Sequence, residues 1–122
     1  MHESGEMYLE TMFVLSTEKG AFRAIDVSER MGFSKPSVSR AMGILKRDGY
    51  ISVDHTGLIS LTDSGRLIAE NIYERHRVLT EILVKIGVAK DTAVEDACRI
   101  EHYISDETFQ AFKKHLKEHS EL

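Results

Sequence analysis

The feature that most constrains the fold is a pair of short helices followed at once by a change in hydrophobic period. Apolar residues recur at helical spacing up to Asp48 and then in short β-type runs from Tyr50. Gly32 suits the position after one helix, and Ser34 suits the N-cap of the next, with Pro36 in its first turn. Two helices joined by a tight glycine-containing turn and followed by a hairpin predict a winged helix-turn-helix.

The same periodicities predict the remaining elements and two domains. We expect a mainly α fold with a small β-hairpin, in which a winged helix-turn-helix DNA-binding domain spans residues 1–62 and a second, helical domain spans residues 63–122. The predicted helices are Met7–Ser16, Ala24–Met31, Ser34 to about Asp48, Ser64–Ile86, Thr92–Tyr103 and Asp106–Glu118, and the predicted strands are Tyr50–Val53 and Leu58–Leu61.

Composition limits the compartment. The chain has 122 residues, of which 42% are hydrophobic and 30% are charged, as in ordinary globular proteins. No run approaches the roughly 18 apolar residues of a membrane span, and the polar, acidic N-terminus is unlike a secretory signal. One cysteine, Cys98, excludes an internal disulfide framework and fits a reducing compartment. We therefore expect a cytoplasmic protein with no membrane association.

The net charge of −4 is distributed unevenly, which keeps nucleic acid open as a partner. Residues 34–50 carry four basic side chains against one acidic one, a local charge of +3, and the rest of the chain carries −7. The predicted third helix also presents short hydroxyl side chains near its start, where they allow close approach to DNA. We predict that Arg40 reads a base and that Lys46 and Arg47 contact phosphates. The full set of predicted DNA-contacting residues is Ser34, Lys35, Pro36, Ser37, Ser39, Arg40, Lys46 and Arg47.

A second group of residues has the chemistry of metal ligands. Cys98, Glu101 and His102 fall at i, i+3 and i+4, so a helix would turn a thiolate, a carboxylate and an imidazole in one direction. The spacing alone leaves two other interpretations open, because a lone cysteine is often a small buried hydrophobe and Glu–His pairs are common on solvated helix faces. Met7 and Glu10 share a face of the first helix, and spacing alone does not assign them or His76 to a site.

At this point the sequence resembles a known family. The matching runs, in order, are Met7–Glu10, Ser34–Ser39, Leu61–Gly65, His76–Arg77 and above all Glu95–Glu107 (EDACRIEHYISDE). They are similar to the diphtheria-toxin-repressor family of iron- and manganese-dependent transcriptional regulators over nearly the whole chain. The resemblance implies a metal-dependent repressor that binds a palindromic double-stranded DNA operator as a homodimer. It implies that residues 63–122 form the dimerisation and metal-binding domain, in the short form of the family that lacks an SH3-like domain.

The resemblance also assigns ligands. Met7, Cys98, Glu101 and His102 match the primary activating site, and Glu10 and His76 match further ligand positions. Manganese-type members have carboxylates where this chain has Met7 and Cys98. Thioether and thiolate ligands suit softer ions, so we expect Fe(II), with Mn(II) or another divalent transition metal as the alternative. Val94 and Thr80 replace the neighbours of the iron-type ancillary site, which is expected to be absent or rebuilt.

Two other functions are compatible with the sequence. One is a winged-helix regulator governed by a small organic ligand or by oxidation of Cys98. The other is a metalloenzyme using Glu101 as a base, but no residue pattern pairs it with a nucleophile or a substrate pocket. We therefore expect the protein not to be an enzyme.

Overall fold

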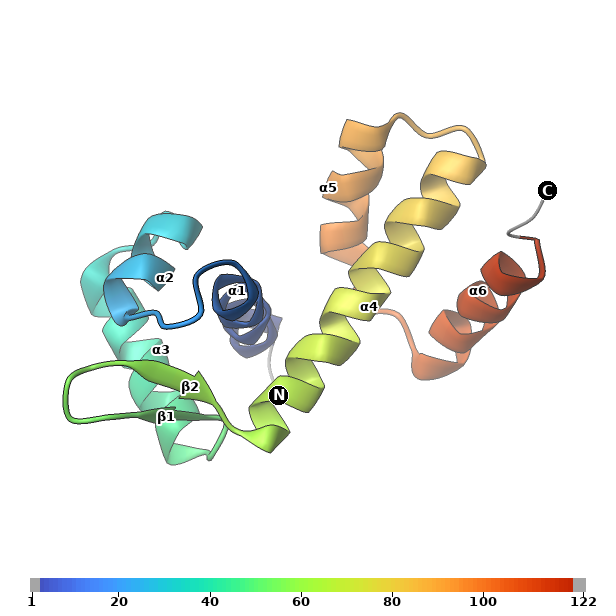
Figure 1. Cartoon of the computed structure of the whole chain (residues 1–122). Helices are drawn as coiled ribbons and strands as arrows, with labels where there is room; N and C mark the ends of the chain where they lie inside the picture. The colour runs from blue at the N-terminus through green and yellow to red at the C-terminus, as the bar shows by residue number, and fades with distance from the viewer. Residues whose placement is uncertain (1–2, 120–122) are drawn as a thin grey trace. The chain divides into compact units, whose positions relative to one another are not determined.

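The structure is a computed structural model, and it describes residues 3–119. Within these residues the chain forms six helices and one two-stranded hairpin (Figure 1), so the predicted fold class is confirmed. The chain divides into two compact units, one ending at Glu70 and the other beginning at Asn71. The elements are α1 (Glu3–Lys19), α2 (Ala24–Met31), α3 (Lys35–Arg47), β1 (Ile51–Val53), β2 (Ile59–Leu61), α4 (Asp63–Lys85), α5 (Lys90–Ile100) and α6 (Asp106–Glu118).

Several boundaries differ from those predicted, among them the start of α1 and the end of α5. α1 begins at Glu3 and is four residues longer at its start than its apolar spacing indicated, because polar residues also continue a helix. α5 ends at Ile100 rather than Tyr103. The chain then turns toward Ser105, whose extended backbone and side-chain cap begin α6. Glu101 and His102 therefore lie in the turn that follows α5 and not within the helix.

The first unit has one apolar core shared by α1, α2, α3 and the hairpin. The hairpin is antiparallel and pairs Ile51 with Leu61 and Val53 with Ile59, while Phe22 forms an isolated bridge to Ile59. α1 packs against β2 and α3 against β1, while α2 packs against α1 and α3, as a winged helix-turn-helix requires. The core residues are Tyr8, Leu9, Met12, Leu15, Phe22, Val27, Val38, Met42, Leu45, Ile51, Ile59 and Ala69.

Local sequence signals set the turn before α3 and the start of α4. Gly32 takes a left-handed backbone (φ 70°) after α2, and the Ser34 side chain accepts a hydrogen bond from the Ser37 amide, as predicted for a cap. The Thr62 hydroxyl donates to the Gly49 carbonyl at 2.7 Å and accepts from the Gly65 amide at 3.1 Å. These bonds attach the end of the hairpin to the end of α3.

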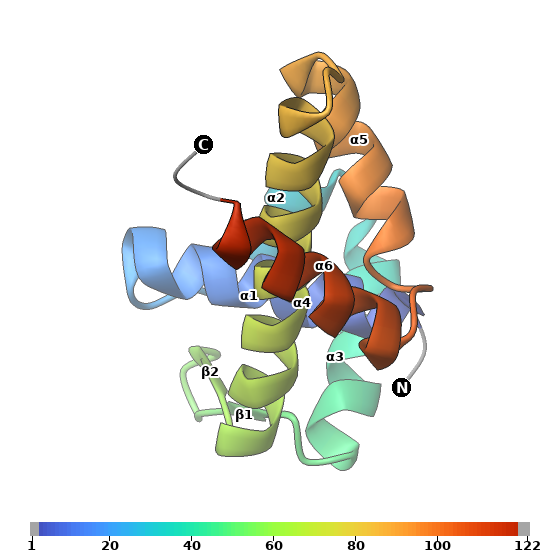
Figure 2. The ribbon, with the colours of Figure 1, turned by 90° about the vertical axis from the view of Figure 1, so that its right-hand side faces the viewer.

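The second unit contains most of α4 together with α5 and α6. Figure 2 shows α6 crossing the middle of α4, where Lys113 forms an ion pair with Glu74 at 2.5 Å. Small residues, Ala93 and Ala97, form the buried face of α5 and allow close helix packing. The unit buries Ile72, Val78, Leu79, Ala93, Ala97 and Phe109. None of the described helices combines the length and apolarity that a membrane span requires.

Candidate metal centre and nucleic-acid interface

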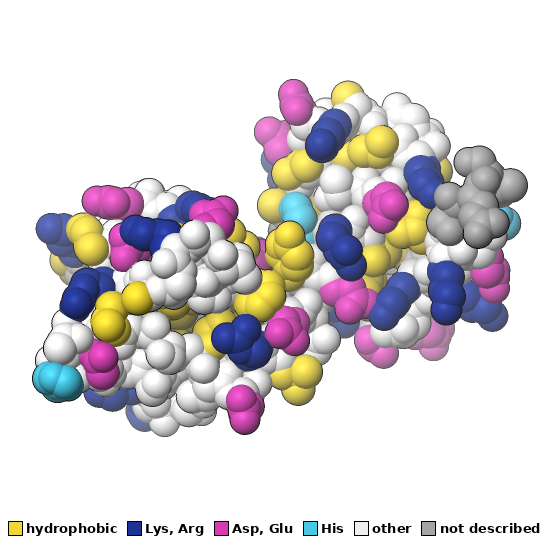
Figure 3. All heavy atoms as spheres, in the orientation of Figure 1, with side chains coloured by type: hydrophobic (Ala, Val, Ile, Leu, Met, Phe, Trp, Pro, Cys, Tyr) yellow, Lys and Arg dark blue, Asp and Glu magenta, His cyan; other side chains and the backbone are white. Residues whose placement is uncertain are grey.

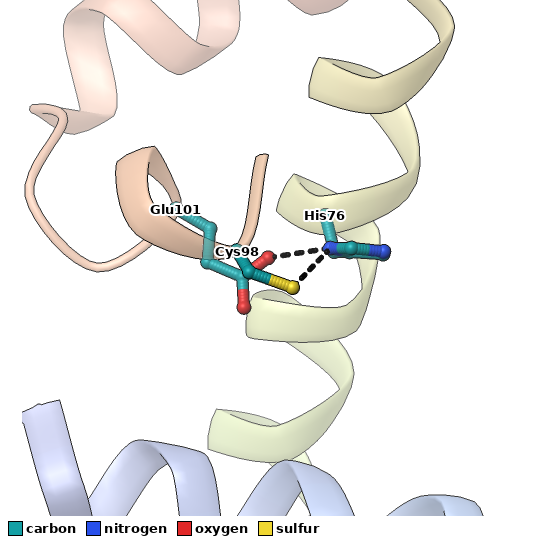
Figure 4. Close-up of side chains that lie close together, drawn as sticks. All are labelled: His76, Cys98 and Glu101. Carbon is teal, nitrogen blue, oxygen red and sulfur yellow. Dashed lines mark hydrogen bonds and ion pairs between the residues drawn. The ribbon is translucent and has the colours of Figure 1, made fainter. Parts of the chain in front are cut away.

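Three predicted ligands of the second unit converge on one point between α4 and α5. His76 Nδ1 lies 2.9 Å from Glu101 Oε2 and 3.7 Å from Cys98 Sγ, as the dashed lines in Figure 4 show. A ligand atom from each of the three residues lies within 4.8 Å of those of the other two. Ligands on opposite sides of a transition ion are about 4.0–4.6 Å apart, so this spacing suits a shared ion. His76 thus belongs to the same cluster as Cys98 and Glu101.

Glu101 is the centre of this arrangement. Its residue is only 1% exposed, and it is the one charged residue among the described ones that is buried. His76 faces one carboxylate oxygen, and His102 Nε2 lies 3.4 Å from the other. A buried carboxylate is costly unless it is paired or coordinates a metal, because it has lost its hydration. The described residues therefore fit a divalent ion: a buried negative charge, two imidazoles and a thiol that can ionise.

Met7 and Glu10 belong to the first unit, on α1. Met7 is 37% exposed, so its side chain is not part of the core that Tyr8, Leu9 and Met12 form. Glu10 is half-buried. Their role as ligands stays a prediction.

The expected loss or rebuilding of the ancillary site also stays a prediction. Thr80 Oγ1 is buried and has no hydrogen-bond partner, alone in this respect among the described side chains. Thr80 lines a hollow together with His76 and Glu81, and Val94 offers no ligand atom. Among the described residues that line this hollow, only His76 and the exposed Glu81 have side chains that commonly bind metals.

The predicted DNA-contacting residues all lie on the exposed side of α3 and its N-terminal turn. Val38, Met42 and Leu45 face the core, and the eight predicted residues are exposed. Arg47 Nε lies 3.2 Å from Asp48 Oδ1, an exposed ion pair that leaves the guanidinium accessible. Burial raises the pKa of Tyr8, and the nearby charge of Arg40 lowers it by a smaller amount. The exposed side of α3 presents hydroxyls near its start and cations along its whole length, from Lys35 to Arg47.

The hairpin loop is held by residues that the sequence analysis did not single out. Asp54 Oδ1 accepts hydrogen bonds from the Thr56 amide, the Thr56 hydroxyl and the Leu58 amide. Arg23, at the start of α2, donates to the Thr56 carbonyl. These contacts fix the predicted wing against α2.

Arg75 is a second residue that sequence reasoning missed. Its guanidinium donates to the carbonyls of Glu101 and Ile104, so it contacts the turn that carries two predicted ligands. Its position next to His76 is the only signal in the sequence, and that signal does not reveal partners 26 and 29 residues away.

Comparison with known proteins finds a family model that matches each part of the chain. The family model described as "Iron dependent repressor, N-terminal DNA binding domain" matches residues 1–57, and "Iron dependent repressor, metal binding and dimerisation domain" matches residues 62–121. The chain belongs to the diphtheria-toxin-repressor family. It is a metal-dependent transcriptional repressor, not an enzyme, and its two domains bind DNA and a divalent metal and dimerise. The predicted resemblance is confirmed.

Individual relatives include both iron and manganese regulators. The chain is 32% identical over 112 residues to the transcriptional regulator MntR of Escherichia coli O6:H1, covering 92% of this chain and 72% of that protein. It is 32% identical over 117 residues to the diphtheria toxin repressor of Corynebacterium diphtheriae, covering 95% of this chain and 52% of that protein.

Solved structures of metal-dependent regulators are also similar to this chain. The manganese regulator SloR matches with a TM-score of 0.82 and 26% identity over 96% of this chain. A manganese-dependent transcriptional repressor in complex with manganese matches with a TM-score of 0.81 and 29% identity over 93% of this chain. This chain spans 55% and 52% of those two structures. These similarities do not choose between iron and manganese.

Proposed function

We propose that this protein is an Fe(II)-responsive repressor that binds a palindromic operator as a homodimer and controls metal-homeostasis genes in the cytoplasm. The observation that carries the choice of metal is the position of Cys98 Sγ, 3.7 Å from His76 Nδ1 in the Glu101 cluster. A thiolate in the ligand shell favours softer ions over Mn(II), which prefers oxygen. Met7 is proposed as a second sulfur ligand and Glu10 as a further carboxylate.

Within the second unit, the chain's own residues prepare the site. His76 on α4 and Glu101 after α5 join two helices through their side chains, and His102 lies on the other side of the carboxylate. A bound divalent ion supplies positive charge that offsets the buried carboxylate. The ion favours the DNA-competent state only as far as it binds that state more tightly than the other one. Because His76 lies on α4 and Cys98 on α5, the ion's affinity depends on how these two helices are arranged, and it can therefore differ between the two states.

The DNA-binding role is supported by α3. Ser34 caps α3 by accepting from the Ser37 amide, and the exposed side chains of this first turn are accessible to phosphate oxygens and base edges. Arg40 is proposed to read a base, and Lys46 and Arg47 are proposed to contact phosphates. Ser34, Lys35, Pro36, Ser37 and Ser39 are proposed to complete the interface.

Homodimerisation is supported by apolar side chains that reach the surface of the second unit. Ile86 and Tyr103 are each 73% exposed, and Tyr73 and Val84 are also exposed. Figure 3 shows hydrophobic side chains at the surface of the part formed by α4 and α5. Large exposed apolar residues are typical of interaction surfaces. In a two-fold dimer the α3 helix of each subunit would contact one half-site of a palindrome.

Anaerobic calorimetric titration of the metal-stripped protein with Fe(II) and with Mn(II) tests the proposal. Tight binding of about one Fe(II) per chain, with Mn(II) much weaker, is the expected result. Comparable affinities and two ions per chain would point to a manganese regulator. No binding of either ion would contradict the metal-responsive function and favour control by an organic ligand or by oxidation of the exposed Cys98.

Two variants test the proposed ligands of α1. Met7→Leu and Glu10→Gln are each expected to weaken Fe(II) binding, because each removes one donor atom. Met12→Leu is a control for the loss of a thioether, since Met12 lies in the core. Unchanged Fe(II) affinity in both α1 variants would remove them from the site.

A further inference from the structure

We propose that Arg75 is a positioning residue for the metal centre, holding the Glu101–Ile104 turn against α4; the proposal rests on the proposed metal site. Arg75 Nη1 donates to the Ile104 carbonyl at 3.0 Å and to the Glu101 carbonyl at 3.5 Å. The side chain is 19% exposed, so these bonds are largely shielded from water. Arg75 has no ligand atom for a cation.

The turn needs such a contact because it lies outside regular structure. α5 ends at Ile100, and Glu101 and His102 follow it in a turn before α6 begins. The last carbonyls of a helix lack partners within the helix and carry its partial negative charge, which a cation stabilises. Arg75 supplies a donor and positive charge to the carbonyl of Glu101, the C-cap of α5, and a donor to the Ile104 carbonyl at the far end of the turn.

The result is that Glu101 is held at both ends. Its carboxylate faces His76 and His102, and its carbonyl accepts from Arg75. His76 and Arg75 are consecutive in α4, so one segment of that helix contacts both the side chain and the main chain of the same ligand residue. This arrangement fixes where the carboxylate lies relative to His76.

Two further contacts hold the guanidinium itself. Its central carbon lies 5.2 Å from the centre of the Phe109 ring, and Nη2 lies 3.7 Å from Asp106 Oδ1 in the first turn of α6. Phe109 is buried, so the aromatic contact is the stable one, whereas Asp106 is mostly exposed and its ion pair adds little. Arg75 thereby connects α4, the ligand turn and α6.

Electrostatics alone predicts the opposite effect on metal binding. A guanidinium near a cation site repels the ion, so deleting the charge would tighten binding if Arg75 acted only as a charge. Deleting a positioning contact instead weakens binding, and partners of metal ligands typically contribute 10–100-fold in affinity. The sign of the change therefore separates the two roles.

The test uses Arg75→Met and Arg75→Lys in the full chain, with Arg77→Met as the matched control. Arg77 is an exposed arginine two positions away, and its loss removes the same charge without touching the turn. Co(II) affinity is measured anaerobically by competition with a chelating dye. The absorption spectrum of the Co(II)-saturated protein reports ligand geometry, and thermal unfolding of the metal-free protein reports stability.

We expect Arg75→Met to bind Co(II) at least about tenfold more weakly than the wild type, and its saturated spectrum to change. Arg75→Lys keeps the charge and a donor but lacks the planar guanidinium that packs against the Phe109 ring, so it should recover only part of the affinity. Arg77→Met should bind equally well or more tightly.

The alternative results are distinct. A lower unfolding temperature in Arg75→Met with unchanged Co(II) affinity and spectrum would make Arg75 a stability residue and overturn the proposal. Equal weakening in Arg77→Met would overturn it as well. If Arg75→Met does not fold, Arg75→Gln takes its place, because its side chain is uncharged and two atoms shorter; wild-type Co(II) affinity and spectrum in that variant would contradict the positioning role. Failure of the wild-type chain to bind any divalent ion would instead refute the proposed function, and the positioning role with it.

Discussion

At the scale of single residues, Glu101 is the side chain on which metal binding should depend most. Glu101→Gln keeps the size and hydrogen-bonding shape but removes the charge that the ion neutralises. Mutating a residue that only hydrogen-bonds to a metal ligand typically lowers metal affinity by about 10–100-fold. We expect Fe(II) affinity to fall by at least this much, because Glu101 is itself a proposed ligand. Competition titration measures this change.

The control for this prediction is Glu95→Gln. Glu95 is an exposed glutamate on α5, the helix that precedes Glu101, so its loss changes the net charge equally without touching the cluster. Equal affinity losses in the two variants would mean that Glu101 acts only through bulk electrostatics.

Cys98 is the proposed determinant of which metal is preferred. Cys98→Asp replaces a soft sulfur ligand with a hard oxygen, and its exposed position accommodates the change. We expect the ratio of Mn(II) to Fe(II) affinity to rise relative to the wild type, as measured by parallel anaerobic titrations. Cys98→Ser, which removes the thiolate without adding a carboxylate, is the comparison. An unaltered ratio in Cys98→Asp would show that the thiol does not contact the ion.

At the scale of elements, the start of α4 depends on a glycine. A Cβ built on Gly65 would lie 2.0 Å from the Tyr50 carbonyl oxygen, and backbone atoms cannot yield as a flexible side chain would. We expect Gly65→Ala to destabilise the protein by about 1–3 kcal/mol or more in chemical unfolding.

Gly43 in α3 gives the matched comparison. Nothing lies within 4 Å of a Cβ placed there, so Gly43→Ala should stabilise the exposed helix by up to about 1 kcal/mol. Stabilisation by both substitutions would show that helix propensity, and not the close approach at Tyr50, decides the result.

The hairpin loop should respond to acid through Asp54. Hydrogen bonds from the Thr56 side chain, followed by that from the Leu58 amide, lower the pKa of Asp54 below its ordinary value of 3.8. The carboxylate therefore contributes stability above pH 3.8 that is lost as the pH falls through the depressed pKa. We expect Asp54→Asn to be less stable than the wild type near neutral pH, with the difference shrinking below pH 3.8. Thermal unfolding at a series of pH values measures it, and a constant difference would contradict the assignment.

How far sequence predicts these elements depends on how local their determinants are. Ser34 and Ser105 cap the helices that follow them as predicted, because a cap is decided within three residues. The end of α5 was predicted too late, since the helical spacing of Cys98, Glu101 and His102 hides the turn. Arg75 could not be found, because its partners are fixed by tertiary packing. The α2 cap, made by Arg23 with Asp26, was missed because arginine is not a usual capping residue.

At the scale of the whole molecule, the family and the pairing of a DNA-binding with a metal-binding domain could be predicted because ordered motifs span the chain. The sequence favours Fe(II) only through the residue types at positions 7 and 98, since the choice of metal depends on which donor atoms converge. The spacing of Cys98, Glu101 and His102 left their role open, and the family resemblance assigned them and His76 as ligands; that His76 lies in one cluster with Cys98 and Glu101 became visible only in the packing of α4 against α5.

Metal binding should therefore increase the stability of the second unit against unfolding. An ion that binds only the folded state stabilises it by about 2.7 kcal/mol at 100 times its dissociation constant. We expect calorimetry with Fe(II), under anaerobic conditions, to show a higher unfolding temperature for the transition that includes the unit beginning at Asn71. A chelator should reverse the shift. Because the stabilisation requires the buried carboxylate, Glu101→Gln should show little shift at the same ion concentration, and Glu95→Gln a full one. An equal shift in Glu101→Gln would place the stabilising ion elsewhere in the chain.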